Sequence, residues 1–323
     1  MAIIAPEAAP PQEPSRSFIA VNLAICSLLW GSSYLFIKLM SGEVSALAIA
    51  ASRGVLGAAV LSLWSFGRGR NPLPRRAEIV PWIMLGTTNG WLPNVLVGYA
   101  LVQLASGPAA MIQAAGPLVT ALVAHLVFSE ERLNRRRLGG ILLGMIGVAL
   151  LIGPRLFEGG GTALSVLAMI GATLSYTVAN LYVRIVPAAT GDPARLALGQ
   201  QMFSGSIATI LALTVVGPAA FAPLRDHLPA MLALGIFATA IPVTVFMRLI
   251  RAAGPTRAAM TGYLVPTVAV ILGILVLHED LELRQVLGGC IILAGVFLVT
   301  TAPRTIRSSC LPQPARRLWP ASS

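Results

Sequence analysis

One arginine lies deep within an apolar run of the sequence and is the first candidate for binding chemistry. Arg53 stands about nine residues into the run 44–66, which would place it ~13 Å along a helix that rises ~1.5 Å per residue. If this run crosses a bilayer, a charge at that depth costs at least ~2.5–3.5 kcal/mol on insertion scales. No carboxylate stands at a comparable depth in the sequence. Backbone carbonyls, polar side chains, water or a substrate must therefore bind the guanidinium.

Two interpretations of Arg53 stay open. In the first, it attracts an anionic group of a substrate. In the second, it is structural and bonds carbonyls at helix ends.

Polar and aromatic side chains recur in the neighbouring apolar runs. A hydroxyl or an amide that faces lipid lacks a partner, so we expect these side chains to face inward, where they can bond other helices or a substrate. Interhelical bonding is the commoner outcome for any one of them. The residues predicted to contact substrate, with Arg53, are Trp30, Ser33, Tyr34, Asn94, Gln113, Tyr176, Asn180 and Tyr263.

Prolines stand in the middle of four apolar runs, at Pro93, Pro117, Pro242 and Pro266. Each removes one helical hydrogen bond and is expected to kink its helix. A carbonyl freed in this way is tolerated in a membrane only where protein or water bonds it. These prolines therefore predict helices that line a cavity, and a packing kink without substrate contact is the alternative.

Charged residues at the ends of apolar runs form a second group. Glu130 and Glu279 each end a run. A proton-coupling role is one interpretation, but water screens charges near an interface, so a structural ion pair is favoured. Lys38 and Arg184 close two other runs, and we expect their side chains to snorkel to the interface, with gating as the alternative.

Other chemistry has little support in the sequence. The histidines 125, 227 and 278 form no metal-ligand set, and the three cysteines include no C-x-x-C pair. No nucleophile-and-base pair, phosphate-binding glycine loop or cofactor motif is present. We expect no catalytic residue, no bound metal and no cofactor, and the chain is not expected to be an enzyme.

The composition indicates that the surrounding elements are membrane spans. Hydrophobic residues make up 56% of the 323 residues, charged residues 11%, and the mean hydropathy is +0.81. Soluble domains carry roughly 25% charged residues. A spanning helix needs ~20 mostly apolar residues, and ten such runs are expected, at roughly 18–39, 44–66, 79–101, 106–128, 138–153, 163–185, 195–217, 228–249, 256–277 and 286–302.

The net charge of +11 is concentrated in short arginine clusters between these runs, which argues against a nucleic-acid partner. With ten spans, most Lys and Arg residues fall on the side that carries both termini. Because basic loops stay in the cytoplasm, both termini are predicted to be cytoplasmic. A bacterial cytoplasmic membrane suits the short loops.

The sequence also repeats itself at a spacing of about 149 residues. Pro93 and Pro242 are 149 residues apart, and so are Pro117 and Pro266. Five spans in each half is an odd number, so the second half must enter the membrane from the opposite side, as in many secondary transporters. The expected fold is an all-α integral membrane protein of two inverted five-helix repeats: a disordered N-terminus at 1–17, repeats at 18–153 and 163–302, a linker at 154–162 and a basic tail at 303–323.

The chain resembles the EamA-type transporters of the drug/metabolite transporter superfamily. The resemblance rests on Leu29-Trp30-Gly31-Ser32-Ser33-Tyr34, on Ser52-Arg53, on Phe128-Ser129-Glu130-Glu131-Arg132-Leu133 after Pro117, and on Leu277-His278-Glu279-Asp280-Leu281 after Pro266. It covers residues from about Phe18 to Thr301. It implies export or exchange of small metabolites and no single substrate.

These observations lead to one main hypothesis, a secondary transporter that exports or exchanges small organic metabolites, amino-acid-like or hydrophobic, by alternating access. Its expected partners are a small-molecule substrate and the lipid bilayer, and a homodimer is one assembly that the sequence allows. The runner-up is a nucleotide-sugar or sugar-phosphate carrier of the same superfamily. A membrane-embedded lipid-modifying enzyme, a sensor subunit and a channel are less favoured.

Overall fold

The computed structural model describes residues 15–127, 133–153, 160–186, 192–253 and 260–301. Within these ranges the chain is helical, apart from its connections and one isolated bridge between Ser41 and Val44. The expected motif residues Glu130, Glu131 and Arg132 lie outside the described residues.

The first half of the chain forms α1 to α7. Its elements are α1 (Arg16–Met40), α2 (Ala46–Phe66), the 3-10 turn η1 (Arg76–Glu78), α3 (Ile79–Gly86), the π-helical segment η2 (Thr87–Trp91), α4 (Leu92–Gln103), α5 (Ser106–Ala114), α6 (Gly116–Val127) and α7 (Arg135–Ile152).

The second half follows the same order. Its elements are α8 (Gly160–Ile185), α9 (Pro193–Leu211), the π-helical η5 (Ala212–Val216), the 3-10 helix η6 (Pro218–Arg225), α10 (Leu228–Leu232), the π-helical η7 (Ala233–Ala240), α11 (Ile241–Ala253), α13 (Thr261–Leu277) and α14 (Leu283–Thr301).

The prediction of a helical integral membrane protein is confirmed. Among the described residues, seven helices are long and apolar enough to cross a bilayer, and Thr261–Leu277 is a shorter apolar helix. The count of ten spans stays a prediction, as do the boundaries of the five parts of the chain.

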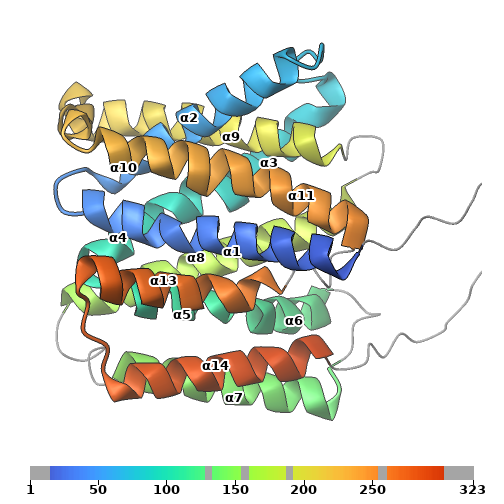
Figure 1. The fold of residues 1–323 in the computed structure, drawn as a ribbon, viewed down its shortest axis with the longest axis vertical. Helices are drawn as coiled ribbons and strands as arrows, with labels where there is room; N and C mark the ends of the chain where they lie inside the picture. The colour runs from blue at the N-terminus through green and yellow to red at the C-terminus, as the bar shows by residue number, and fades with distance from the viewer. Residues whose placement is uncertain (1–14, 128–132, 154–159, 187–191, 254–259, 302–323) are drawn as a thin grey trace, which may run out of the picture.

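Equivalent helices of the two halves pack against each other. In Figure 1, α2 lies against α9 at one edge of the molecule and α7 lies against α14 at the opposite edge. Gly140 of α7 lies against Gly295, and Gly147 lies against Gly288. Residue numbers rise along one helix as they fall along the other, so the pair is antiparallel, as a two-fold axis in the membrane plane requires.

A π-helical segment interrupts the third expected span of each half. Segment η2 lies between α3 and α4, and segment η7 lies between α10 and α11. Segment η2 precedes Pro93 and segment η7 precedes Pro242. A proline has no N–H, so a carbonyl of the preceding turn loses its helical donor. Side chains of other helices donate to carbonyls in these turns. Ser175 Oγ donates to Thr88 O at 2.7 Å, Gln200 Nε2 to Asn89 O at 3.1 Å, and Arg53 Nη2 to Ala238 O at 3.5 Å. Pro93 and Pro242 thus each follow a turn whose carbonyls bond side chains of other helices.

The other two prolines behave differently, although they are 149 residues apart. The helix is interrupted between α5 and α6, just before Pro117. Pro266 lies inside α13, which continues through it without a break.

Close backbone contact at the α2–α9 crossing generates a stability prediction. A Cβ atom on Gly54 would lie 2.6 Å from Gly205 Cα, whereas a Cβ on Gly139 would meet nothing within 4 Å. Gly54→Ala is expected to lower the free energy of unfolding by roughly 1–3 kcal/mol through overpacking. Thermal unfolding in detergent measures the effect. Gly139→Ala is the matched control. Equal melting temperatures for the two variants would contradict the close contact between Gly54 and Gly205.

A buried ion pair at the start of α3 and α9 generates a pH prediction. Glu78 Oε1 accepts from Arg195 Nε at 2.5 Å, and their side chains are 5% and 12% exposed. The hydrogen bond from Arg195 is the main cause that lowers the pKa of Glu78 below its usual range. A lowered pKa in the folded state stabilises the fold above the ordinary glutamate pKa, and this is lost as pH falls through the folded value.

We therefore expect the melting temperature in detergent to drop below about pH 4, with a smaller drop in Glu78→Gln. A drop of the same size in Glu78→Gln would show that other groups cause it.

Candidate functional site

Six polar side chains from both halves meet in the interior and form what we term the polar belt. The helices α1, α2, α4, α5, α8 and segment η7 contribute one side chain each. The members are Tyr34, Arg53, Asn94, Gln113, Tyr176 and Thr239.

Arg53 is the centre of one group of contacts in the belt. Its Nε donates to Thr239 Oγ1 at 2.8 Å, and its Nη1 donates to Asn94 Oδ1 at 3.2 Å. Tyr176 donates its hydroxyl to the same Asn94 oxygen at 3.5 Å. Asn94 therefore connects Arg53 to α8.

A second contact joins α1 to α5. The Tyr34 hydroxyl donates to Gln113 Oε1 at 2.7 Å, and Tyr34 interacts electrostatically with Tyr176 and Arg53. The two groups of contacts therefore lie near each other.

Local structure determines how Arg53 meets Thr239. The Thr239 hydroxyl donates to Leu234 O, five residues earlier, at 2.7 Å. This spacing belongs to the π-helical segment, and it leaves a lone pair of the hydroxyl oxygen free to accept from Arg53. The break before Pro242 thus supplies Arg53 with both a hydroxyl and a carbonyl. The structural interpretation of Arg53 is supported by these bonds, and they do not remove its charge.

The charge of Arg53 has no acidic partner among the described residues. Its bonded partners, Thr239, Asn94 and Ala238, are all neutral. The described carboxylates stand at helix ends or in connections. A guanidinium held by neutral groups in the interior can bind the acidic group of a ligand as a charge-assisted hydrogen bond.

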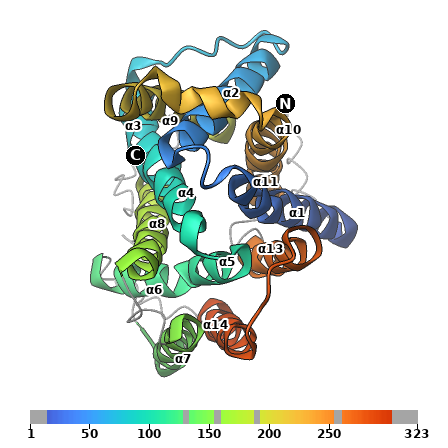
Figure 2. The same ribbon diagram turned by 90° about the vertical axis from the view of Figure 1, so that its left-hand side faces the viewer.

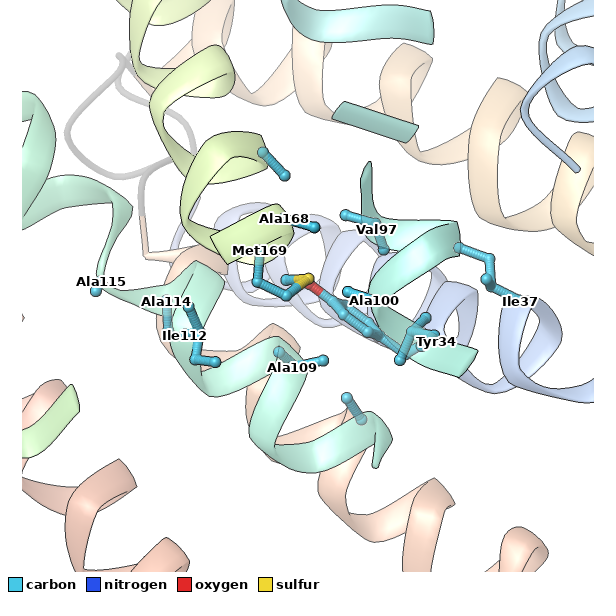
Figure 3. Packing of buried hydrophobic residues seen from close by; sticks show 14 of the residues in the cluster. Tyr34, Ile37, Val97, Ala100, Ala109, Ile112, Ala114, Ala115, Ala168 and Met169 are labelled. Carbon is cyan, nitrogen blue, oxygen red and sulfur yellow. The ribbon is translucent and has the colours of Figure 1, made fainter. Parts of the chain in front are cut away.

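Apolar side chains close the belt on one side. Figure 3 shows the Tyr34 ring among Val97, Ala100, Ala109 and Met169, with its hydroxyl pointing toward Met169. Tyr34 is 4% exposed, and Ala100, Ala109 and Met169 are fully buried.

Several predicted site residues lie outside the belt. Trp30 packs edge-on against Phe246 of α11, with ring centroids 4.9 Å apart. Ser33 donates to Trp30 O in its own helix at 2.6 Å. Tyr263 bonds Thr300 of α14, and Asn180 is exposed.

Sequence reasoning missed Thr239 and Gln200. Thr239 stands three residues before Pro242, in the turn that this proline opens. Gln200 exchanges two bonds with Asn89, to its carbonyl at 3.1 Å and from its side-chain nitrogen at 2.9 Å. Position relative to the prolines was the signal that could have found Thr239. In the described part of the chain, no group of three His, Cys, Asp or Glu side chains could hold a metal.

The bond between Arg53 and Asn94 generates a testable coupling. Asn94→Leu leaves a buried donor unsatisfied and is expected to cost roughly 1–3 kcal/mol of stability. In an Arg53→Met background the same change is expected to cost less, because both partners are then apolar. Thermal unfolding of the two single variants and the double variant measures the coupling. Additive effects would mean that the bond contributes nothing.

Comparisons with known proteins match nearly the whole chain. A sequence model described as the EamA-like transporter family matches residues 17–153 and 163–301. The chain is 26% identical over 279 residues to the uncharacterized inner membrane transporter YedA of Escherichia coli (strain K12), covering 84% of this chain and 87% of that protein. It is 20% identical over 285 residues to the uncharacterized transporter YoaV of Bacillus subtilis, covering 87% and 97%.

A third relative is the protein PecM of Dickeya dadantii, 23% identical over 277 residues, covering 84% of this chain and 88% of PecM. A solved crystal structure superimposes with a TM-score of 0.62 at 19% identity, covering 88% of this chain and 98% of the other. That similarity concerns the fold alone. The two family matches, one for each half of the chain, show that this protein belongs to the EamA-like transporter family.

Proposed function

We propose that this protein is a secondary transporter that exports or exchanges small organic metabolites by alternating access, and that the polar belt binds the substrate. The substrates that suit the belt are amino-acid-like or hydrophobic solutes with one acidic group. The single observation that carries the proposal is Arg53, a cation in the interior whose described bonds all go to neutral groups.

Aromatic and amide groups complement this charge. Tyr34, Tyr176 and Gln113 lie near Arg53 and combine apolar surface with hydrogen-bonding atoms. Small-molecule sites combine apolar contact with a few polar groups that fix orientation. The relatives named as transporters support transport rather than catalysis.

Burial along α8 supports access from one side at a time. Met169, Tyr176 and Asn180 follow one another at intervals of seven and four residues, so they share a face of the helix. Met169 is fully buried, Tyr176 is half-buried and Asn180 is exposed. We propose from this gradient that the belt is reached from the C-terminal end of α8 and is closed toward the start of α8.

The location of the basic residues supports an orientation. Arg68, Arg75, Arg135 and Arg195 stand at the end of the bundle that carries Arg16 of α1. By the positive-inside rule that end faces the cytoplasm, which makes this conformation open to the cytoplasm. We propose a cytoplasmic membrane of a bacterium as its location.

A nucleotide-sugar or sugar-phosphate carrier is less favoured. Phosphate groups carry more charge than a carboxylate and need several basic partners. Among the six described members of the belt, Arg53 is the single basic side chain.

Counterflow in proteoliposomes tests the proposal. Panels of labelled amino acids and short organic acids are compared with their amide or decarboxylated analogues. We expect saturable flux of at least one acid, and loss of more than about tenfold in Arg53→Gln, since a bond to a charged group contributes roughly 1.5–3 kcal/mol. Arg53→Lys is expected to keep part of the preference for acids.

Arg225→Gln is the matched control, because Arg225 is 81% exposed at the surface. Flux of an acid that is unchanged in Arg53→Gln would overturn the role of the belt. Absence of saturable flux for every panel member would overturn the proposed transport of such solutes.

A further inference from the structure

The end of the bundle opposite Arg16 and Thr301, which we term the distal face, carries the connections 41–45, 104–105 and 278–282. It is the left-hand end in Figure 1 and faces the viewer in Figure 2, where α1, α4, α5 and α13 lie close together. Two charged side chains of this face have roles that differ from those expected.

Lys38, expected to snorkel, instead binds the end of α4. Its Nζ donates to Leu101 O at 2.8 Å and to Leu104 O at 2.9 Å. These are carbonyls of the last turn, where helical donors run out and the helix dipole is negative. A cation at this position complements the helix end.

Glu279, expected in an ion pair, instead binds the start of α5. Its two carboxylate oxygens accept from Ser106 N at 3.0 and 2.9 Å, and Oε1 also accepts from Ser106 Oγ at 3.0 Å. Ser106 is fully buried. An anion at the first turn complements the positive end of α5.

A left-handed residue directs Glu279 to this site. His278 has φ +52° and ends α13, and Glu279 N then donates to Gly273 O at 3.0 Å. The chain therefore turns back over the end of α13. Gly273 leaves the space that the carboxylate occupies, because a Cβ there would lie 2.5 Å from Glu279 Oε2.

The two charges hold the α4–α5 connection from both sides. Lys38 comes from the first half of the chain and Glu279 from the second, and the two interact electrostatically. The contact between Glu279 and Ser106 thus joins the halves. Beneath it, Met40, Leu101 and Ala109 are fully buried and Ile37 is 2% exposed, so the distal face is closed where this contact lies.

We propose that Lys38 and Glu279 form a latch that keeps the distal face closed in this conformation and opens when the distal face opens. The latch rests on the proposed transport function. The contacts that join the halves are those of Glu279 with the N–H and the hydroxyl of Ser106, which water can replace once the halves separate. Lys38 holds the end of α4 within the first half. Opening would therefore expose polar groups that water can bond, while the apolar residues beneath remain with their own helices.

The test measures accessibility rather than flux. In a background with the three cysteines replaced, a single cysteine is placed at Ala109, beneath the latch, or at Asn180, near the opposite face. A membrane-impermeant maleimide is applied to each face in turn, with right-side-out and inverted vesicles. Lys38→Met and Glu279→Gln are expected to raise labelling at position 109 from the distal face at least fivefold and to lower labelling at position 180.

A second variant tests the latch without removing a charge. Ser106→Pro removes the N–H and the hydroxyl that Glu279 accepts from, and proline suits the first position of a helix. Ala105 has φ −67° and ψ 154°, a conformation compatible with a following proline. The same labelling changes are expected. Asp226→Asn is the control, because Asp226 is 65% exposed on the same face.

Each outcome decides the proposal. Unchanged labelling at position 109 in all three variants would overturn the latch, and so would increased labelling at both positions, which indicates general loosening. If Lys38→Met or Glu279→Gln does not fold, Ser106→Pro provides the same comparison. Opposite changes at the two positions without any saturable flux would support the latch and count against the proposed transport.

Discussion

Two prolines, each of which removes a backbone donor from a helix, determine how the interior of this protein is built. Pro93 and Pro242 each remove a helical donor, and in the turns before them the carbonyls of Asn89 and Ala238 bond side chains from neighbouring helices. In a bilayer a carbonyl without a helical donor is tolerated only where protein or the water of a cavity bonds it. The helix before each proline widens into a π-helical segment, which turns the carbonyl and the nearby hydroxyl toward the partner. The requirement is the same in both halves, but the partners differ.

The two partners differ in charge, since one is an amide and the other a guanidinium. At Asn89 an amide, Gln200, satisfies the carbonyl and is itself satisfied by the Asn89 side chain. At Ala238 a guanidinium does so, and it has donors left over for Thr239 and Asn94. The contact between Gln200 and Asn89 is neutral, and each side chain has a hydrogen-bond partner in it. The guanidinium keeps a positive charge, which can still attract an anion.

The sequence predicted the class of the protein and its duplication because both depend on composition and on spacing along the chain. It also predicted that the mid-span prolines would need bonding partners. It did not predict which side chains would meet. A π-helical segment adds a residue to a turn and rotates every later side chain by ~100°, so Thr239 could not be placed on the Arg53 side by counting at 3.6 residues per turn.

Nor did the sequence distinguish Pro117, where the helix breaks, from Pro266, where it continues. Those positions depend on neighbouring helices. Tyr263 and Trp30 show the same limit, since each contacts a helix far along the chain, Thr300 of α14 and Phe246 of α11.

Charges at helix ends were misassigned for a related reason. Lys38 and Glu279 stand near the ends of apolar runs, where solvent and opposite charges are the usual partners. The connection between α4 and α5 is short, so a C-terminal and an N-terminal helix end lie next to each other and present carbonyls and N–H groups without helical partners. A cation and an anion from two other helices satisfy these groups. Bonds of this kind can be exchanged for bonds to water when the surface opens, whereas Arg53 bonds neutral groups of α4 and η7 within the bundle. The Glu279 contact with Ser106 can therefore break when the distal face opens, while the contacts of Arg53 hold α2 against α4 and η7.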